Sequence, residues 1–293
     1  MDTSQASIHR EITPLIQGDC LLVFDRTKNN FDFPVHFHPE YELNLILNAP
    51  GAKRIVGDHM DYIKDYELVF IGPNLFHGWE QGKCNSLSVH EITIQFHKDL
   101  FNTNLLNRNI MKPVKELLQR SLKGVLFSKE ETKTLLPRIL KLYQNNGFDS
   151  FIELLSLLHD LSNTGNQQLL STNHSKADDF YNSDKIKKAY EFIQLNFRDK
   201  IKLEDIAGKL NMTTISFSRL IKRRTGKTFV EFLNDYRIGA ATRMLIDSND
   251  SVAEIAFKCG FNNLANFNRI FKKSKDCSPT QFKNNFLGIK RFY

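Results

Sequence analysis

Two copies of one helix-turn-helix pattern near the C-terminus limit the possible folds of this chain more than any other feature. The first copy runs from Leu203 to Thr225 and the second from Val252 to Lys273. A repeated pattern of apolar and basic residues at helical spacing predicts two similar units on a shared scaffold. The recurring residues are Ile206-Ala207 and Ile255-Ala256 at a shift of 49, then Phe217, Arg219, Lys222 and Phe267, Arg269, Lys272 at a shift of 50.

The positive charge of the chain is concentrated in the same region. Residues 184–293 hold 22 Lys and Arg against 11 Asp and Glu, although the net charge of the whole chain is only +7. A basic block joined to a mildly acidic remainder is typical of a module that binds a polyanion, fused to a part that binds something else. A solvated helical surface has a similar charge, so the repeat is needed to favour nucleic-acid binding.

Length and composition restrict the class of protein. A chain of 293 residues has room for about two domains. It contains no long apolar run of the kind that spans a membrane, and its first ten residues are too polar for a secretory signal. Widely spaced cysteines are typical of reduced thiols. We therefore expect a cytoplasmic protein that does not bind membranes. The cysteines are Cys20, Cys84, Cys259 and Cys277.

The hydrophobic period changes along the chain from that of strands to that of helices. Residues 21–96 alternate short apolar runs with turn residues, which is typical of a β sandwich or barrel. Beyond residue 112 the spacing is helical: Pro113 suits a first helical turn, and Ser128 with Glu131 forms a capping-box pattern. The predicted strands are 21–24, 41–47, 53–56, 67–71 and 88–96; the predicted helices include 148–161, 184–196, 203–210, 215–224, 229–246, 252–259 and 263–273.

These elements predict an α+β protein of two domains. Residues 1–162 would form an antiparallel β barrel with following helices. The polar segment 163–182 would be a linker, and residues 183–293 an all-α domain with two helix-turn-helix units joined by a long helix. The apolar stripe of residues 148–161 suits either the core of the first domain or a dimer seam, and both interpretations stay open.

The second helix of each unit is predicted to enter the major groove of DNA. Arginine donates to a guanine edge or to phosphate, asparagine pairs with adenine, and flanking lysines hold phosphates. On one scaffold, the two helices would enter successive major grooves roughly 34 Å apart. The predicted base-reading residues are Ile215, Ser216, Ser218, Arg219, Leu264, Ala265, Asn266, Asn268 and Arg269; the predicted phosphate contacts are Lys222, Arg223, Arg224, Lys272 and Lys273.

Residues 184–293 resemble the C-terminal domain of the AraC/XylS family of bacterial transcription regulators. The motif from Val252 to Phe282 follows the family signature, and residues 203–227 repeat it more weakly. The resemblance implies promoter DNA as a partner, with activation through RNA polymerase as the more usual outcome. Two positions depart from the family pattern, because Asn211 and Asp276 stand where glycine is common. Both residue types tolerate left-handed backbone, so the fold is compatible with them.

A second cluster lies in the N-terminal half. The segment from His36 to Glu42 places His36, His38 and Glu42 at equal parity, so one strand would direct all three to one face, where His77 would join them. This set resembles the cupin barrel, in which such residues converge on one centre. Three interpretations stay open: a small-molecule pocket without metal, a divalent-metal site, and histidines that serve only structure. Arg54 and Trp79 are weaker candidates for the pocket.

We therefore predict a homodimeric transcription regulator, not an enzyme, whose N-terminal domain senses a small molecule. One alternative is a metal-dependent cupin enzyme fused to a DNA-binding tail. The other is an architectural DNA-binding protein whose barrel only dimerises.

Overall fold

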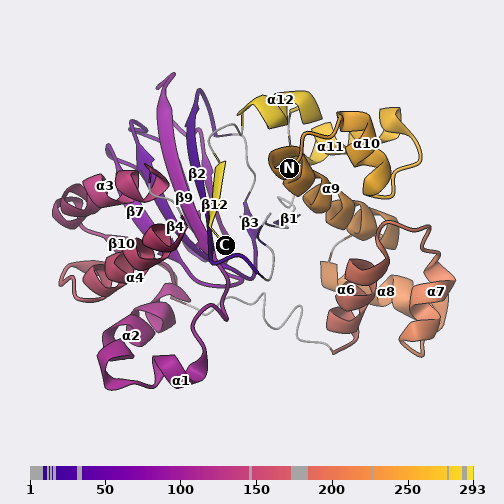
Figure 1. The fold of residues 1–293 in the computed structure, drawn as a ribbon, viewed down its shortest axis with the longest axis horizontal. Coiled ribbons are helices and arrows are strands. Elements are labelled where there is room, and N and C mark those ends of the chain that lie inside the picture. Colours follow the sequence, from indigo (N-terminus) through magenta and orange to yellow (C-terminus); the bar gives the residue numbers. More distant parts are fainter. Residues whose placement is uncertain are drawn as a thin grey trace, which may run out of the picture. The chain divides into compact units, whose positions relative to one another are not determined.

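The chain folds into two compact units (Figure 1). The computed structural model describes residues 9–11, 13, 15, 18–31, 35–144, 147–172, 184–225, 227–275, 277–285 and 289–292. The β-rich unit contains the described residues between 15 and 172, together with 9–10 and 289–292. The helical unit contains those between 184 and 285, together with Glu11 and Thr13. The predicted α+β fold of two domains is confirmed.

The strands of the β-rich unit form two sheets. The five predicted strands are all present, and the other strands were not in that prediction. Neighbouring strands pair antiparallel except β1 with β3, which are parallel. The five-stranded sheet has the order β1 (His9–Arg10), β3 (His36–Phe37), β8 (His77–Glu80), β5 (Lys53–Val56), β6 (His59–Tyr62). The seven-stranded sheet has the order β11 (Gln167–Leu169), β10 (Val125–Phe127), β7 (Glu67–Ile71), β4 (Tyr41–Leu47), β9 (Val89–Phe96), β2 (Leu21–Lys28), β12 (Ile289–Phe292).

The two faces of the seven-stranded sheet differ because successive side chains of a strand point to opposite sides. One face is apolar, whereas the other combines polar side chains with a smaller apolar cluster that includes Ile46 and Val69. Leu43, Phe70 and Ile94 lie on the apolar face, in the same core as side chains of three helices. Those helices are α2 (Lys112–Ser121), α3 (Lys129–Gln144) and α4 (Phe148–Ser162). The short helices α1 (Thr103–Leu106) and η1 (Asn109–Met111) precede them. The larger core thus lies on one side of the seven-stranded sheet, and the opposite face, where polar residues adjoin the smaller apolar cluster, is left for a binding site.

The apolar stripe of α4 serves mainly this core. Leu154, Leu157, Leu158 and Leu161 are fully buried. Among its large apolar residues, Phe148 and Ile152 are exposed, with exposed fractions of 71% and 46%, and Phe151 and Leu155 are half-buried. The core interpretation therefore accounts for most of the stripe.

The predicted linker 163–182 begins too early in the sequence, because its first residues belong to the β-rich unit. β11 pairs with β10, and Asp58 then accepts hydrogen bonds from Ser171 Oγ at 2.8 Å and from Thr172 N at 2.9 Å. Residues 167–172 are therefore part of the β-rich unit. Polar composition predicted a linker, but here the polar side chains bind a carboxylate and each other.

The predicted C-terminal boundary of the helical domain, residue 293, is also wrong. We expected only helices beyond residue 183, but Ile289–Phe292 form strand β12, which pairs with β2 in the β-rich unit. Pairing gives the edge strand β2 partners for backbone groups that would otherwise be unpaired along that edge. The chain therefore leaves the β-rich unit, forms the helical unit and returns.

The helical unit contains the two predicted helix-turn-helix units. Phe232 and Leu233 of the long helix α9 pack in one core with Phe217, whereas Ile238 and Leu245 pack in a second core with Phe267. α9 therefore supports both units, as predicted. The helices are α6 (Asp184–Asn196), α7 (Leu203–Lys209), α8 (Thr214–Thr225), α9 (Phe229–Asp247), α10 (Val252–Lys258), α11 (Leu264–Lys275) and α12 (Pro279–Asn285).

Left-handed residues make the turn inside each helix-turn-helix unit. Asn211 has a φ of 51° and Gly260 a φ of 81°. The prediction that Asn211 replaces glycine in a left-handed turn is confirmed. Asp276, for which we made the same prediction, lies outside the described residues.

Two expectations from composition can be compared with the structure. All four cysteines are free thiols. Among the described residues, none of the helices combines the length and the apolar character required to cross a bilayer.

Candidate functional site

The helices α8 and α11 present their predicted base-reading side chains outward. Phe217 and Phe267, one in each helix, are fully buried and anchor the helices to their cores. Most predicted phosphate contacts, Lys222, Lys272 and Lys273, are exposed as well, while the side chains of Arg223 and Arg224 lie outside the described part of the chain. The exposed base-reading candidates are Ile215, Ser216, Arg219, Leu264, Ala265, Asn266, Asn268 and Arg269; Ser218 is half-buried.

Side-chain caps fix the first turn of both helices. Thr213 Oγ1 accepts a hydrogen bond from Ser216 N at 3.1 Å, and Asn263 Oδ1 accepts one from Asn266 N at 2.9 Å. Such caps satisfy backbone donors that have no partner within the helix.

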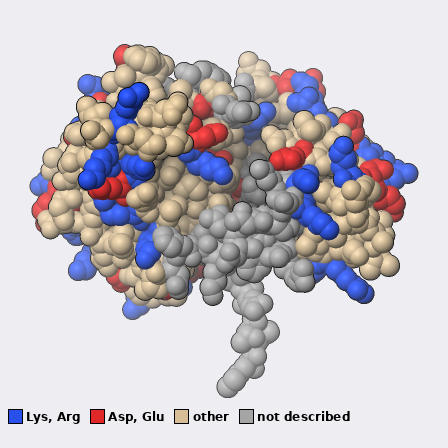
Figure 2. Space-filling view, turned by 90° about the horizontal axis from the view of Figure 1, so that it is seen from below, with Lys and Arg blue, Asp and Glu red and all other residues tan. Residues whose placement is uncertain are grey.

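The surface charge is mixed on the face shown in Figure 2. Lys and Arg side chains project there from both units, with acidic side chains among them. The basic excess of residues 184–293 is therefore not one continuous patch on this face. The contribution of this basic excess to DNA binding therefore depends on which lysines and arginines flank α8 and α11.

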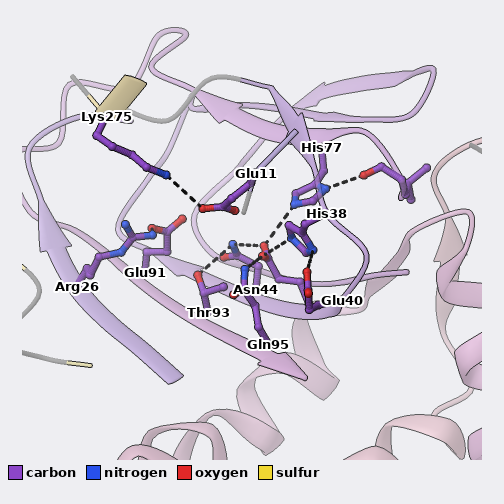
Figure 3. Close-up of polar contacts among 12 residues, drawn as sticks. Glu11, Arg26, His38, Glu40, Asn44, His77, Glu91, Thr93, Gln95 and Lys275 are labelled. Atoms are coloured by element: carbon purple, nitrogen blue, oxygen red, sulfur yellow. Dashed lines mark hydrogen bonds and ion pairs between the residues drawn. The ribbon is translucent and has the colours of Figure 1, made fainter. Parts of the chain in front are cut away.

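A cluster of histidine and glutamate side chains lies buried between the two sheets of the β-rich unit (Figure 3). His36, His38, Glu42 and His77 each offer one ligand atom, and these four atoms lie within 4.8 Å of one another. All four residues are buried. The predicted convergence of the four is confirmed.

The expected single strand from His36 to Glu42 is absent. His36 ends up in the five-stranded sheet and Glu42 in the seven-stranded sheet, with His38 and Pro39 in the crossing between β3 and β4. Proline has no N–H to continue a ladder, so the strand is interrupted at this point. The side chains meet because the two sheets face each other, not because of alternation along one strand.

Hydrogen bonds hold two members of the cluster in place. His77 Nδ1 lies 2.7 Å from the carbonyl oxygen of Leu75, so Nδ1 donates a hydrogen bond to that oxygen and fixes the orientation of the ring. Glu42 accepts hydrogen bonds from Asn44 Nδ2 at 3.1 Å and from Gln95 Nε2 at 2.8 Å. His77 Nε2 lies 3.7 Å from Glu42 Oε1, beyond hydrogen-bond distance.

The ionisation states of the cluster are strongly coupled. Burial would lower the pKa of His38, but Glu40 and Glu42 outweigh burial and raise the pKa of His38 to about 10. Burial would likewise raise the pKa of Glu42, but His38 and His77 hold it well below the usual range. The site therefore combines the ionised Glu42 carboxylate with a protonated His38 ring in a region away from water.

A second buried network lies beside the first. Arg54 Nη1 forms an ion pair with Glu67 Oε2, and Trp79 Nε1 donates to Glu67 Oε1 at 2.8 Å. Despite Arg54 and Trp79, burial raises the pKa of Glu67. The rings of His77 and Trp79 are 6.2 Å apart, so the two networks adjoin. Arg54 and Trp79, the weaker candidates, thus both contact the glutamate at position 67.

Several polar residues of this interior were not singled out from the sequence. Asn44 and Gln95 hold Glu42, while Glu91 forms ion pairs with Arg26 at 2.6 Å and with Lys28 at 3.0 Å. The available signal was alternation: polar residues recur at every second position along 42–44 and 91–95, on strands that are otherwise apolar.

Comparisons with known proteins identify the helical unit. A helix-turn-helix domain family matches residues 206–285. The HTH-type transcriptional regulator YdeC of Bacillus subtilis is 23% identical over 85% of this chain and 86% of its own length. The activator RhaS of Klebsiella pneumoniae is 29% identical, but the match covers only 37% of this chain and 40% of RhaS. The activator RhaR of Mannheimia succiniciproducens is 25% identical over a similarly short stretch, which covers 35% of this chain and 37% of RhaR.

The fold of the whole chain is also found in a solved structure. ToxT from Vibrio cholerae, solved with an unsaturated fatty acid, aligns with a TM-score of 0.56 over 93% of this chain and 99% of ToxT, at 16% identity. The two-domain fold is therefore shared. The family match and the relatives show that the helical unit contains a helix-turn-helix domain similar to those of transcriptional regulators.

Proposed function

We propose that this regulator binds promoter DNA through α8 and α11 and that a small ligand bound in the β-rich unit controls it. The observation that carries the sensor role is the interior between the two sheets. An ordinary core would be apolar there, yet His38, Glu42, Asn44 and Gln95 are all buried. Buried polar groups without a ligand cost stability, so a binding site explains them better than packing does.

This interior favours a ligand different from the fatty acid of the ToxT structure. An acyl chain has no donor for a buried acceptor. Apolar side chains such as Ile46 and Val69 lie nearby, but Asn44 Oδ1 and Gln95 Oε1 are buried acceptors without a hydrogen-bond donor among the described residues. We therefore propose a polar ligand, a metal ion, or both.

The cluster fits a divalent transition metal. Three imidazoles and one carboxylate are a common donor set for zinc, iron, manganese or nickel. Bonds of about 2.0–2.2 Å place neighbouring ligand atoms about 3–4 Å apart, so a span of 4.8 Å requires only a small contraction. Leu75 orients His77, and Asn44 and Gln95 orient Glu42, as outer partners do in metal sites. A bound metal would supply a fixed positive charge that can also coordinate an effector oxygen.

The metal proposal predicts one bound ion per chain. Purified full-length protein, stripped with a chelator and reloaded with Zn²⁺ or Mn²⁺, is expected to retain about one equivalent by elemental analysis. Metal at a hundredfold excess over its Kd should raise the free energy of unfolding by about 2.7 kcal/mol. His77→Ala should abolish both effects. The matched control is His90→Ala, because His90 pairs with Asp25 outside the cluster and should retain the metal.

The metal proposal has a clear negative result. Equal metal content in the wild type and in His77→Ala would contradict it. If the stripped protein takes up none of the tested ions, the metal proposal is wrong, and the interpretation as a small-molecule pocket without metal remains.

The DNA-binding proposal separates two kinds of contact. Lys272→Ala should weaken binding to every duplex alike, and the slope of log K against log salt should fall by about 0.9 because one counterion fewer is released. Arg269→Ala should instead relax the preference at one base pair, with a loss of discrimination of about 1–3 kcal/mol. Lys141→Ala in α3 is the charge-matched control. An unchanged salt slope for Lys272→Ala would show that it contacts no phosphate.

The remaining partners stay predictions. Activation through RNA polymerase rests on the relatives that are named activators, and dimerisation rests on Phe148 and Ile152 of α4. The relatives are regulators, so we propose that the β-rich unit binds its ligand without turnover. A product formed by the metal-loaded chain would instead support the cupin-enzyme alternative.

A further inference from the structure

The two reading helices differ at one structurally equivalent position. The capping residues Thr213 and Asn263 correspond at a shift of 50, and so do the arginines Arg219 and Arg269. Between cap and arginine stands Ser216 in α8 but Asn266 in α11. One turn of helix separates this position from the arginine, so a side chain of sufficient length can reach it.

In α11 the side chains at these two positions are in contact. Arg269 Nη2 donates a hydrogen bond to Asn266 Oδ1 at 2.9 Å, and both side chains are exposed on the outer face of the helix. Asn266 is itself well placed, because its backbone N–H is bound to the cap Asn263. A guanidinium group has five N–H donors, so Arg269 keeps enough donors for the two acceptors of a guanine edge.

In α8 the equivalent contact is missing. Ser216 Oγ accepts a hydrogen bond from Thr213 Oγ1 at 2.9 Å, and its side chain points to the cap instead of the arginine. Within the part of the chain that the structure describes, no hydrogen bond or ion pair involves the Arg219 side chain. Arg219 therefore lacks the intrahelical hydrogen bond that Asn266 forms with Arg269.

We propose that Asn266 is a positioning residue that holds Arg269 ready to bind guanine, so that α11 discriminates bases more sharply than α8. A free arginine side chain loses much rotamer entropy when it binds in one geometry, and a restrained one loses less. The restraint acts on the geometry that matches guanine and not on contacts with phosphate. This role differs from our expectation that Asn266 pairs with adenine, because the oxygen required for adenine is already engaged by Arg269. The proposal rests on the DNA-binding function of α8 and α11.

The test exchanges the two residues. Full-length wild type, Asn266→Ser, Ser216→Asn and Arg269→Ala are each used to select binding sites from a library of randomised duplexes. Asn266→Ser should reduce discrimination at the guanine under Arg269 by about three- to tenfold, the effect of one hydrogen bond. Its salt slope and its unfolding transition should match the wild type. Ser216→Asn should sharpen one position in the other half of the site.

The outcomes distinguish this inference from the proposed function. Selection of no duplex by the wild type would contradict DNA binding itself. A selected site with an unchanged guanine preference in Asn266→Ser would overturn the inference alone. The same holds if Asn266→Ser weakens all duplexes equally, or if Arg269→Ala changes no base preference. Recovery of the preference in Asn266→Gln, which keeps an amide oxygen, would support the positioning role.

Discussion

Arg54→Met is expected to lower the free energy of unfolding of the β-rich unit by about 3–5 kcal/mol, because it leaves the buried Glu67 carboxylate without its cation. Trp79 would still donate one hydrogen bond to Glu67, but a neutral donor does not balance a buried charge. Chemical denaturation followed by circular dichroism measures the loss. The matched control is Lys53→Met, the neighbouring residue in β5.

The control separates burial from charge. Lys53 pairs with Glu80 at 2.9 Å, but the two side chains are 23% and 48% exposed. Exposed pairs contribute at most about 1 kcal/mol, so Lys53→Met should change stability little. Equal losses of unfolding free energy in the two variants would show that burial does not make the Arg54–Glu67 pair more important for stability than the exposed Lys53–Glu80 pair.

The pH dependence of Arg54→Met follows from the raised pKa of Glu67. An acid whose pKa is higher in the folded than in the unfolded state binds more protons when folded. Stability therefore increases as the pH falls from neutral through the folded pKa towards the unfolded value. Removal of Arg54 raises the folded pKa further, so the deficit of Arg54→Met should shrink at low pH. A deficit independent of pH would contradict a charged Glu67.

The sequence predicted most of the long elements because their signals are local. Helices such as α4 and α11 show helical spacing of apolar residues, and strands such as β4 and β7 are apolar runs bounded by turns. β8 and β12 escaped prediction. His77–Glu80 contains a glycine and one large apolar residue, and Ile289–Phe292 becomes a strand only by pairing with β2, far away in the sequence.

The candidate site was predictable in part for the same reason. The histidines and Glu42 form a recognisable spacing, but their supporting amides do not. The register of the seven-stranded sheet pairs Glu42 with Gln95 and Asn44 with Thr93, residues about fifty positions apart. No local pattern specifies that register. Residues that hold a ligand in place are therefore visible only after the strands are paired.

Gly260→Ala is expected to disrupt the second helix-turn-helix unit. A Cβ at this position would lie 2.5 Å from the carbonyl oxygen of Phe197 and 3.0 Å from that of Arg198. Left-handed backbone adds a further cost for a residue with a Cβ. Together the two effects should destabilise the helical unit by about 2–5 kcal/mol.

The carbonyl of Phe197 cannot retreat from an added methyl group without further loss. Arg237 of α9 donates to Phe197 O at 2.8 Å and to Asp199 O at 2.7 Å, so α9 fixes the segment that faces the turn. Two controls isolate the effect. Gly208→Ala lies in α7 with no atom within 4 Å of the new Cβ and should stabilise by about 0.5–1 kcal/mol. Asn211→Gly, at the equivalent left-handed turn, should be neutral or stabilising, since glycine adopts a φ of 51° freely.

The same variant links the turn to DNA recognition. Gly260 connects α10 to the segment that enters α11, so its distortion should displace Arg269 and Lys272 together. Gly260→Ala is therefore expected to lose affinity for all duplexes as well as base preference, whereas Asn211→Gly keeps both. Thermal unfolding and duplex binding of the three variants measure this. Wild-type stability of Gly260→Ala would show that the segment at Phe197 yields, and that the turn does not require glycine.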